Sequence, residues 1–260
     1  MKAYCINLDR RPDRMAFMGD QFARHAIPFV RVSAVDGQDP AVAAEAARVG
    51  PSRLGPRMSA GAYACFQSHR AVWRRLVDSG DRHAMIFEDD LHLAQGIAQY
   101  LDDAWVPRDA DVVRLETFGL RVHLGAGKGL PAGPRRLHRL RSYHPGCGGY
   151  VLSVGAAARL LEATGRFDDP VDYMLFSESS ALFATLTTYQ MLPAPVIQGD
   201  RAARGSTSGW AKSSIADRFA AGEVPTVMTR ESALGRVARR LGAEVAGRLR
   251  GTRYRFVPHG

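Results

Sequence analysis

Several features that would place this chain in a familiar class are missing from its 260 residues. The three cysteines, Cys5, Cys65 and Cys147, are odd in number and widely spaced, so they predict neither a disulfide framework nor a CxxC zinc site. No segment approaches the roughly 20 apolar residues that span a bilayer, and the N-terminal MKAYCINLDR lacks the apolar core of a secretory signal. We therefore expect a protein of the reducing cytoplasm.

The composition is that of an ordinary globular protein, with 46% hydrophobic and 23% charged residues. The length allows one large or two small domains with a substantial core. The net charge of +9 is concentrated near the C-terminus, because residues 230–255 hold eight Arg against two Glu. Such a basic segment fits nucleic acid, an anionic membrane surface or a phosphorylated ligand.

The basic tail combines its arginines with an apolar stripe at helical spacing. This pattern is typical of a helix that lies on an anionic membrane, which would place the protein peripherally at the inner face. Three glycines weaken the helix, so a loosely packed or disordered tail is an equal alternative. Nucleic-acid binding is disfavoured because no aromatic residues are interleaved with the arginines. The stripe consists of Leu234, Val237, Ala238, Leu241 and Val245, and the glycines are Gly235, Gly242 and Gly247.

Apolar strand-like segments alternate with amphipathic helical ones along most of the chain. This order predicts an α/β fold with a mostly parallel sheet, whose ligands bind beyond the carboxyl ends of the strands. A Gly-rich loop is expected through residue 133. The expected strands are 2–8, 28–35, 83–87, 111–116, 148–153 and 187–192, and the expected helices are 13–26, 40–49, 58–80, 154–164 and 170–183.

Three consecutive acidic residues, Glu88, Asp89 and Asp90, follow the strand-like segment 83–87. On an extended chain Glu88 and Asp90 would point to one face and Asp89 to the other, so Glu88 and Asp90 together could hold a hard divalent cation. Such a cation would neutralise a diphosphate leaving group. A solvated acidic loop is the plain alternative. A glycoside hydrolase would need a second carboxylate from elsewhere, facing the first across the scissile bond.

Six segments together resemble glycosyltransferase family 25, the lipooligosaccharide and lipopolysaccharide glycosyltransferases related to the collagen galactosyltransferases. They are CINLDRRPDR, IPFVRVSAVDG, MSAGAYACFQSHRAVWRRLVDSG, AMIFEDDLHL, HPGCGGYVLSVGAAARLL and PVDYML, in family order over about residues 3–200. The resemblance implies a GT-A-like, Rossmann-type catalytic domain over residues 1–200, with 201–260 as a C-terminal extension. It also implies inverting transfer of galactose or a similar hexose from a UDP-sugar to a glycan acceptor such as lipooligosaccharide, with Mn²⁺ or Mg²⁺.

The resemblance also assigns roles to the acidic cluster, which occupies the place of the family's DxD-like motif. Asp90 is the expected metal contact, Asp89 a donor-binding residue, and Glu88 lies nearer the ribose or a metal-bound water. A further metal ligand often comes from the end of the catalytic core in GT-A enzymes. Here VIQGD offers Asp200 or Gln198 and no clear histidine.

Five other residues are candidate donor contacts. Asn7, Arg10 and Arg14 are expected between the first strand and first helix, where an Arg fork and a helix N-terminus suit a phosphate or nucleoside; surface ion pairs are the alternative. Asp36, in the VDG matched to the family, would touch the nucleotide or simply form a turn. His69 shares a helix face with two aromatic residues, so a structural hydrogen bond competes with a donor contact.

Inversion needs a base that takes the proton of the acceptor hydroxyl. Asp172 in PVDYML matches an acidic position of the family and is the candidate, with a helix N-terminal Asp stabilised by the helix dipole as the equal alternative. Asp168, Asp169 and Glu178 are the fallback carboxylates. A nucleotidyltransferase and a non-catalytic nucleotide- or carbohydrate-binding protein are the competing functions.

Overall fold

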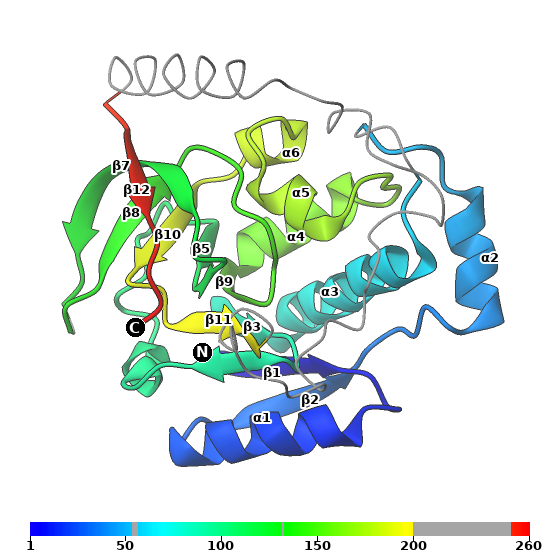
Figure 1. Cartoon of the computed structure of the whole chain (residues 1–260), viewed down its shortest axis with the longest axis horizontal. Helices are drawn as coiled ribbons and strands as arrows, with labels where there is room; N and C mark the ends of the chain where they lie inside the picture. Colours follow the sequence, from blue (N-terminus) through cyan, green and yellow to red (C-terminus); the bar gives the residue numbers. More distant parts are fainter. Residues whose placement is uncertain (54–56, 132, 200–250) are drawn as a thin grey trace.

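A mixed β-sheet forms the centre of the computed structural model, which describes residues 1–53, 57–131, 133–199 and 251–260 (Figure 1). The sheet has nine strands in the order β12-β7-β8-β10-β5-β9-β3-β1-β2. Their bounds are β1 Lys2–Asn7, β2 Phe29–Ser33, β3 His83–Phe87, β5 Val112–Arg114, β7 Arg121–Gly129, β8 Arg136–Leu140, β9 Gly149–Ser153, β10 Thr188–Leu192 and β12 Arg253–Phe256. The predicted α/β class is confirmed.

Helices lie on both faces of this sheet, α1 on one and α3, α4 and α5 on the other (Figure 1). Their bounds are α1 Pro12–Arg24, α2 Pro40–Arg48, α3 Ala60–Ser79, α4 Val154–Ala163, α5 Val171–Phe176 and α6 Ala181–Ala184, with a 3₁₀ turn η1 at Ile97–Tyr100. The ends of α3 follow its sequence signals. Ser59 Oγ accepts a hydrogen bond from the Ala62 N–H, and Gly80 ends the helix in the left-handed region with φ of 73°.

The two faces of the sheet each carry a hydrophobic core. Trp73, Phe66 and Leu76 of α3 are fully buried on one face, against α4 and α5. Met18 and Phe22 of α1 are fully buried on the other, together with Phe87 of β3. Because strands β1 and β3 are buried on both sides, their sequences are continuously apolar and do not alternate.

Strand β9 runs antiparallel between β3 and β5, and this direction places the site. Strands β2, β1 and β3 are parallel, so their carboxyl ends lie along one edge of the sheet. Phe87 pairs with Gly149 at the start of β9, and the Glu88 N–H donates to the Gly148 carbonyl oxygen at 2.8 Å. The segment before β9 therefore meets the residues that follow β3.

A second, three-stranded sheet lies beyond this edge, in the order β4-β11-β6. Its strands are β4 Leu91–Leu93, β6 Glu116–Thr117 and β11 Val196–Gln198. Because β4 begins at Leu91, directly after the acidic cluster, and pairs with β11, the chain cannot continue straight out of β3.

The predicted Gly-rich loop through residue 133 is wrong, because most of it forms strand β7, which pairs antiparallel with β8. Val122 and Leu124 alternate with more exposed residues and are buried, which is a strand pattern that the glycines obscure. Gly127 is needed there, since a Cβ would lie 2.2 Å from the His138 ring. Helix 170–183 is likewise interrupted: α5 ends at Phe176, and Ser180 caps a separate α6.

The end of the chain returns to the main sheet, where β12 pairs antiparallel with β7 (Figure 1). The division at residue 200 stays a prediction, as does the membrane-binding helix, whose stripe from Leu234 to Val245 lies outside the described residues. Within the parts of the chain that the structure describes, the helices are too short or too polar to cross a bilayer.

Candidate functional site

A cavity of about 380 Å³ opens at the carboxyl ends of β1, β2 and β3. Its walls come from the β1–α1 turn, the turn after β2, the first turns of α3 and the acidic cluster after β3. The predicted residues among its lining are Arg10, Arg14, Asp36, His69, Glu88, Asp89 and Asp90. The cavity thus lies where the α/β fold predicts ligand binding, beyond the carboxyl ends of the strands.

Arg14 holds Asp89 and Asp90 together. Its Nη1 lies 2.9 Å from Asp89 Oδ1 and 3.2 Å from Asp90 Oδ2, and all three residues are at most 7% exposed. Asn7, at the end of β1, donates from Nδ2 to Asp89 Oδ2 at 2.7 Å. The alternative that Arg14 forms a surface ion pair is therefore wrong. The group of two carboxylates and one guanidinium has a net charge of −1.

The predicted geometry of the acidic cluster is wrong in one respect. Glu88 and Asp90 do not share a face, because the chain bends at Asp89 and Asp90 toward β4 and does not stay extended. Asp89 and Asp90 both turn to Arg14, whereas Glu88 turns to His69 on α3. Asp89 and Asp90 are nevertheless buried, and all three residues line the cavity, which excludes the solvated acidic loop.

Arg10 and Asp36 form a second charged pair on the cavity wall. Arg10 Nε donates to Asp36 Oδ2 at 2.6 Å, and this hydrogen bond keeps the pKa of Asp36 below its ordinary value despite partial burial. The Asp36 carboxylate also accepts from the Gln38 N–H at 2.9 Å, which closes the predicted turn. Gly37 fits because a Cβ there would lie 2.8 Å from the backbone of Ala60 and Gly61.

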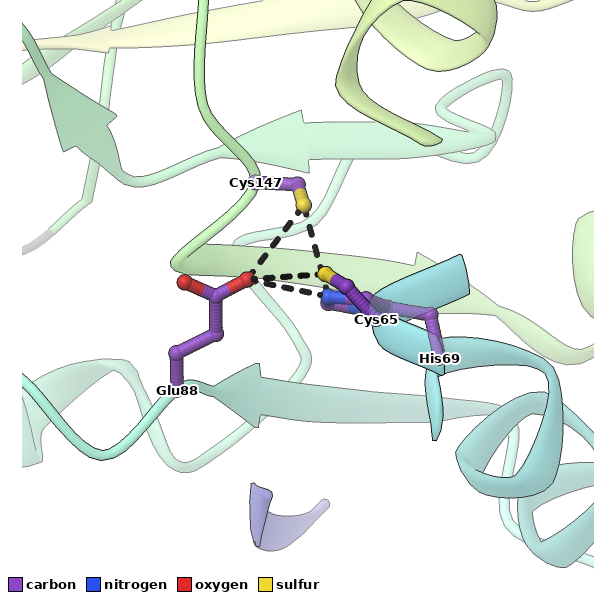
Figure 2. Close-up of side chains that lie close together, drawn as sticks. All are labelled: Cys65, His69, Glu88 and Cys147. Atoms are coloured by element: carbon purple, nitrogen blue, oxygen red, sulfur yellow. Dashed lines mark hydrogen bonds and ion pairs between the residues drawn. The ribbon is translucent and has the colours of Figure 1, made fainter. Parts of the chain in front are cut away.

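His69 lies in a cluster with Cys65, Glu88 and Cys147 (Figure 2). Glu88 Oε1 is 3.2 Å from His69 Nε2, 3.5 Å from Cys147 Sγ and 3.8 Å from Cys65 Sγ. Cys147 Sγ also lies 3.3 Å from His69 Nε2. Cys65 and His69 are one helical turn apart on α3, while Glu88 follows β3 and Cys147 precedes β9.

His69 makes the predicted structural hydrogen bond, and its contact with the donor stays a prediction. Its Nδ1 lies 2.9 Å from the hydroxyl of Tyr150, which also accepts from Trp73 Nε1 at 2.8 Å, and the ring lines the cavity. Burial opposes the charged imidazole, but Tyr150, Cys65 and Glu88 outweigh it and raise the pKa of His69 well above its ordinary value. Burial also opposes the Glu88 charge, yet the hydrogen bond from His69 leaves the pKa of Glu88 lowered.

Asp172 does not line the cavity. It is 4% exposed in the first turn of α5, and its Oδ2 accepts from the Gly146 N–H at 2.8 Å and from the Tyr143 hydroxyl at 3.1 Å. Of the fallback carboxylates, Asp169 accepts from the Arg53 N–H, and Glu178 accepts from the Tyr143 N–H. Asp172 thus braces the segment that leads to Cys147, and its role as base stays a prediction.

Arg114 and Glu116 are two buried residues that were not predicted from the sequence. Both form hydrogen bonds with the segment before β9. Arg114 donates to the carbonyl oxygens of Pro145 and Gly146, and Glu116 Oε2 accepts from the Gly148 N–H at 2.8 Å. Burial raises the pKa of Glu116 to about 8, against the opposing charge of Arg114. Close packing favours glycine at position 148, since a Cβ there would lie 2.7 Å from the Leu91 side chain.

The cysteines of the cluster were also missed as a pair. Cys65 and His69, four residues apart in a predicted helix, were a usable signal, because such residues share a helix face. Cys147 gave no such signal, because it comes close to Cys65 only through the antiparallel pairing of β9 with β3. The third cysteine, Cys5, is buried elsewhere in β1. Asp200, the predicted further metal ligand, lies outside the described residues.

The family that matches this chain is glycosyltransferase family 25, described as an LPS biosynthesis protein, over residues 1–175. The chain belongs to glycosyltransferase family 25. The predicted resemblance and the assignment as a glycosyltransferase are therefore confirmed, and the cavity at the strand ends is the family member's candidate active site.

Two relatives with similar sequences, from Neisseria and Haemophilus, support the same assignment. The lacto-N-neotetraose biosynthesis glycosyltransferase LgtB of Neisseria meningitidis serogroup B is 32% identical over 188 residues, 68% of each chain. The lipooligosaccharide biosynthesis protein lic2B of Haemophilus influenzae is 25% identical over 75% of each chain. A solved glycosyltransferase involved in glycosylation of the major capsid of PBCV-1 shows 7% identity and a TM-score of 0.42, covering 76% of this chain and 91% of its own.

Proposed function

We propose that this glycosyltransferase binds a UDP-sugar in the cavity at the strand ends and transfers its hexose, galactose in the first instance, to a glycan acceptor. The observation that carries the proposal is the wall of the cavity, which combines two arginines, four carboxylates and a helix N-terminus around one space of about 380 Å³. A nucleoside diphosphate presents both the anionic and the hydrogen-bonding groups that such a wall recognises.

The donor phosphates are assigned to the first turn of α3 and to the nearby arginines. Ser59, Ala60 and Gly61 line the cavity at the N-terminus of a helix of 20 residues, where free N–H groups and the helix dipole favour anions. The bidentate pair of Arg10 and Asp36 is assigned to the nucleoside, because it presents both donors and acceptors on the same wall.

A divalent cation, Mn²⁺ or Mg²⁺, fits the acidic wall in ligand type and in charge. Asp90 and Asp89 supply hard carboxylate oxygens beside the cavity, and Arg14 leaves the pair with a net charge of −1. Asp90 would hold the ion, with Asp200 as the proposed further ligand. When bound, the ion would supply Lewis-acid stabilisation of the diphosphate leaving group.

Inverting transfer requires the acceptor hydroxyl to attack the anomeric carbon while the bond from that carbon to the phosphate oxygen breaks and UDP leaves. Asp172 is the proposed base that takes the hydroxyl proton. Two hydrogen bonds hold its carboxylate in place, from the Gly146 N–H and from the Tyr143 hydroxyl.

The acceptor is proposed to be a lipid-linked glycan of the lipooligosaccharide or lipopolysaccharide class. Support comes from the names of the family and of its relatives in Neisseria and Haemophilus. A cytoplasmic protein placed at the inner face of the membrane by its basic tail would meet such an acceptor. Liposome sedimentation with and without residues 230–260 tests this placement, and equal sedimentation of the two chains removes it.

Calorimetry with UDP, with and without Mn²⁺, combined with a donor-hydrolysis assay, tests the proposed reaction. Asp90→Ala should abolish the metal-dependent part of UDP binding. Asp172→Asn should retain binding and lose turnover by about 10²–10⁴-fold, the usual contribution of a general base. Asp20→Ala, on the exposed side of α1, is the matched control.

The competing functions give different results. Release of pyrophosphate in place of UDP indicates a nucleotidyltransferase. Tight metal-dependent UDP binding without turnover indicates a binding protein. An Asp172→Asn variant with full turnover would show that another group takes the proton.

A further inference from the structure

The cluster of Cys65, His69, Glu88 and Cys147 has the composition of a transition-metal site, which the widely spaced cysteines did not suggest. It combines two thiols, one imidazole and one carboxylate, whose ligand atoms all lie within 4.8 Å of one another. Sulfur and imidazole ligands favour Zn²⁺ over Mn²⁺ or Mg²⁺, which prefer oxygen. The cluster is therefore chemically distinct from the carboxylates of Asp89 and Asp90.

The spacing of these atoms matches the edges of a coordination tetrahedron. Bonds of roughly 2.0–2.3 Å from zinc to N, O and S place neighbouring ligand atoms about 3.3–3.8 Å apart. Four of the six separations, between Glu88 Oε1 and each of the other three ligand atoms and between Cys147 Sγ and His69 Nε2, run from 3.2 to 3.8 Å, and all six are within 4.8 Å. Figure 2 shows the four side chains converging on one point from three segments of the chain.

Hydrogen bonding alone accounts poorly for this convergence. Three donor groups, from Cys65, His69 and Cys147, face the single oxygen Oε1 of Glu88, which has only two lone pairs to accept them. One cation at the centre satisfies all four groups at once.

The surroundings also meet the requirements of a metal site. The Tyr150 hydroxyl lies 2.9 Å from His69 Nδ1, which fixes the ring with Nε2 directed at the cluster. His69 and Cys147 are buried at 0% and 4% exposure, whereas Cys65 and Glu88 are partly exposed and line the cavity. The cavity therefore gives an ion a way in.

We propose that Cys65, His69, Glu88 and Cys147 bind one Zn²⁺ ion in a closed tetrahedral site at the inner wall of the cavity. The ion joins α3, the end of β3 and the entry to β9, so its role is to hold the cavity wall in place. Glu88 and His69 then serve as metal ligands in place of their predicted donor contacts. The site shares the cavity wall with the proposed donor site through Cys65, His69 and Glu88, but it uses neither the arginines nor Asp89 and Asp90, to which the donor and the Mn²⁺ are assigned.

The test measures zinc in the full-length chain after reconstitution with Zn²⁺ under reducing conditions and desalting. Elemental analysis should find about one zinc ion per chain, the stoichiometry of a four-ligand site. Replacement by Co²⁺ should give the intense visible bands of tetrahedral cobalt and the near-ultraviolet bands of thiolate ligation. Cys147→Ser should lose both signals, whereas Cys5→Ala, at the buried cysteine outside the cluster, should keep them.

A milder variant covers the case in which Cys147→Ser fails to fold. Tyr150→Phe leaves all four ligands in place and removes only the hydroxyl at His69 Nδ1, so zinc affinity should fall about 10–100-fold. Tyr189→Phe, whose hydroxyl donates to Asp109 on the surface, is the matched control and should bind zinc like the unmodified chain. The affinities are read by competition with a chromophoric chelator.

Several results would overturn the proposal. These are zinc no higher than in a buffer blank, cobalt spectra without thiolate bands, and equal affinities for Tyr150→Phe and Tyr189→Phe. A thiol count of the unfolded, unreduced chain that finds one free cysteine in place of three would show a Cys65–Cys147 disulfide, which also overturns it.

Discussion

Removal of the Arg14 guanidinium tests whether this side chain is the cation that holds the acidic cluster together. Arg14→Met keeps much of the side-chain volume but leaves Asp89 and Asp90 facing each other without their shared partner. Arg14 is 3% exposed, and its Nη1 lies 2.9 and 3.2 Å from the two carboxylates. Breaking a buried charge pair from one side typically costs about 3–5 kcal/mol, because the remaining charge stays buried and uncompensated.

Thermal unfolding measures this cost. For a chain of this size a loss of 1 kcal/mol corresponds to about 2–4 °C in Tm, so Arg14→Met should lower Tm by about 6 °C or more. Arg24→Met makes the same substitution at the exposed end of the same helix, where Arg24 Nε donates to the Asp20 carbonyl oxygen at 3.1 Å. Surface changes of this kind fall within about 0.5 kcal/mol.

A divalent cation should partly rescue the Arg14 variant. With the guanidinium gone, the two carboxylates carry a charge of −2 in place of −1, so Mn²⁺ should raise the Tm of Arg14→Met more than that of the unmodified chain. Equal Tm values for Arg14→Met and Arg24→Met would refute the account of the cluster. So would a Tm of Arg14→Met that does not respond to Mn²⁺ while the unmodified chain does.

Two further substitutions have defined outcomes. Gly37→Ala should destabilise the fold by about 1–3 kcal/mol and weaken UDP binding, since its Cβ would meet the backbone of Ala60 at 2.8 Å. Gly19→Ala, in an open position of α1, should stabilise by about 0.5–1 kcal/mol, and equal urea midpoints would contradict the packing argument. Asp103 has a lowered pKa, chiefly from the hydrogen bond with His83, so its stabilising contribution is present above its ordinary value near 3.8 and is lost as pH falls below it. Urea titrations at pH 6 and pH 3 should therefore show that Asp103→Asn is less stable than the unmodified chain at pH 6 and that this difference is smaller at pH 3, and a constant difference would count against this coupling.

The local pattern of the chain was enough to predict most of its elements. The apolar run of β1 and β3, the Ser59 cap and the Gly80 stop of α3 each depend on neighbours in sequence, and each is present in the structure. The position of the acidic cluster at a strand end follows from the same local signals. The hairpin of β7 and β8 was missed because glycines masked its alternation.

Contacts between distant segments followed from the tertiary structure alone. Arg14 meets Asp89 across 75 residues, and Cys147 meets His69 across 78, because strand order and the antiparallel direction of β9 bring those segments together. The bend after β3 that separates Glu88 from Asp90 is set by the pairing of β4 with β11, more than a hundred residues further on. Local periodicity encodes which residues form a strand, whereas the partners of its last side chains depend on which other strands lie beside it.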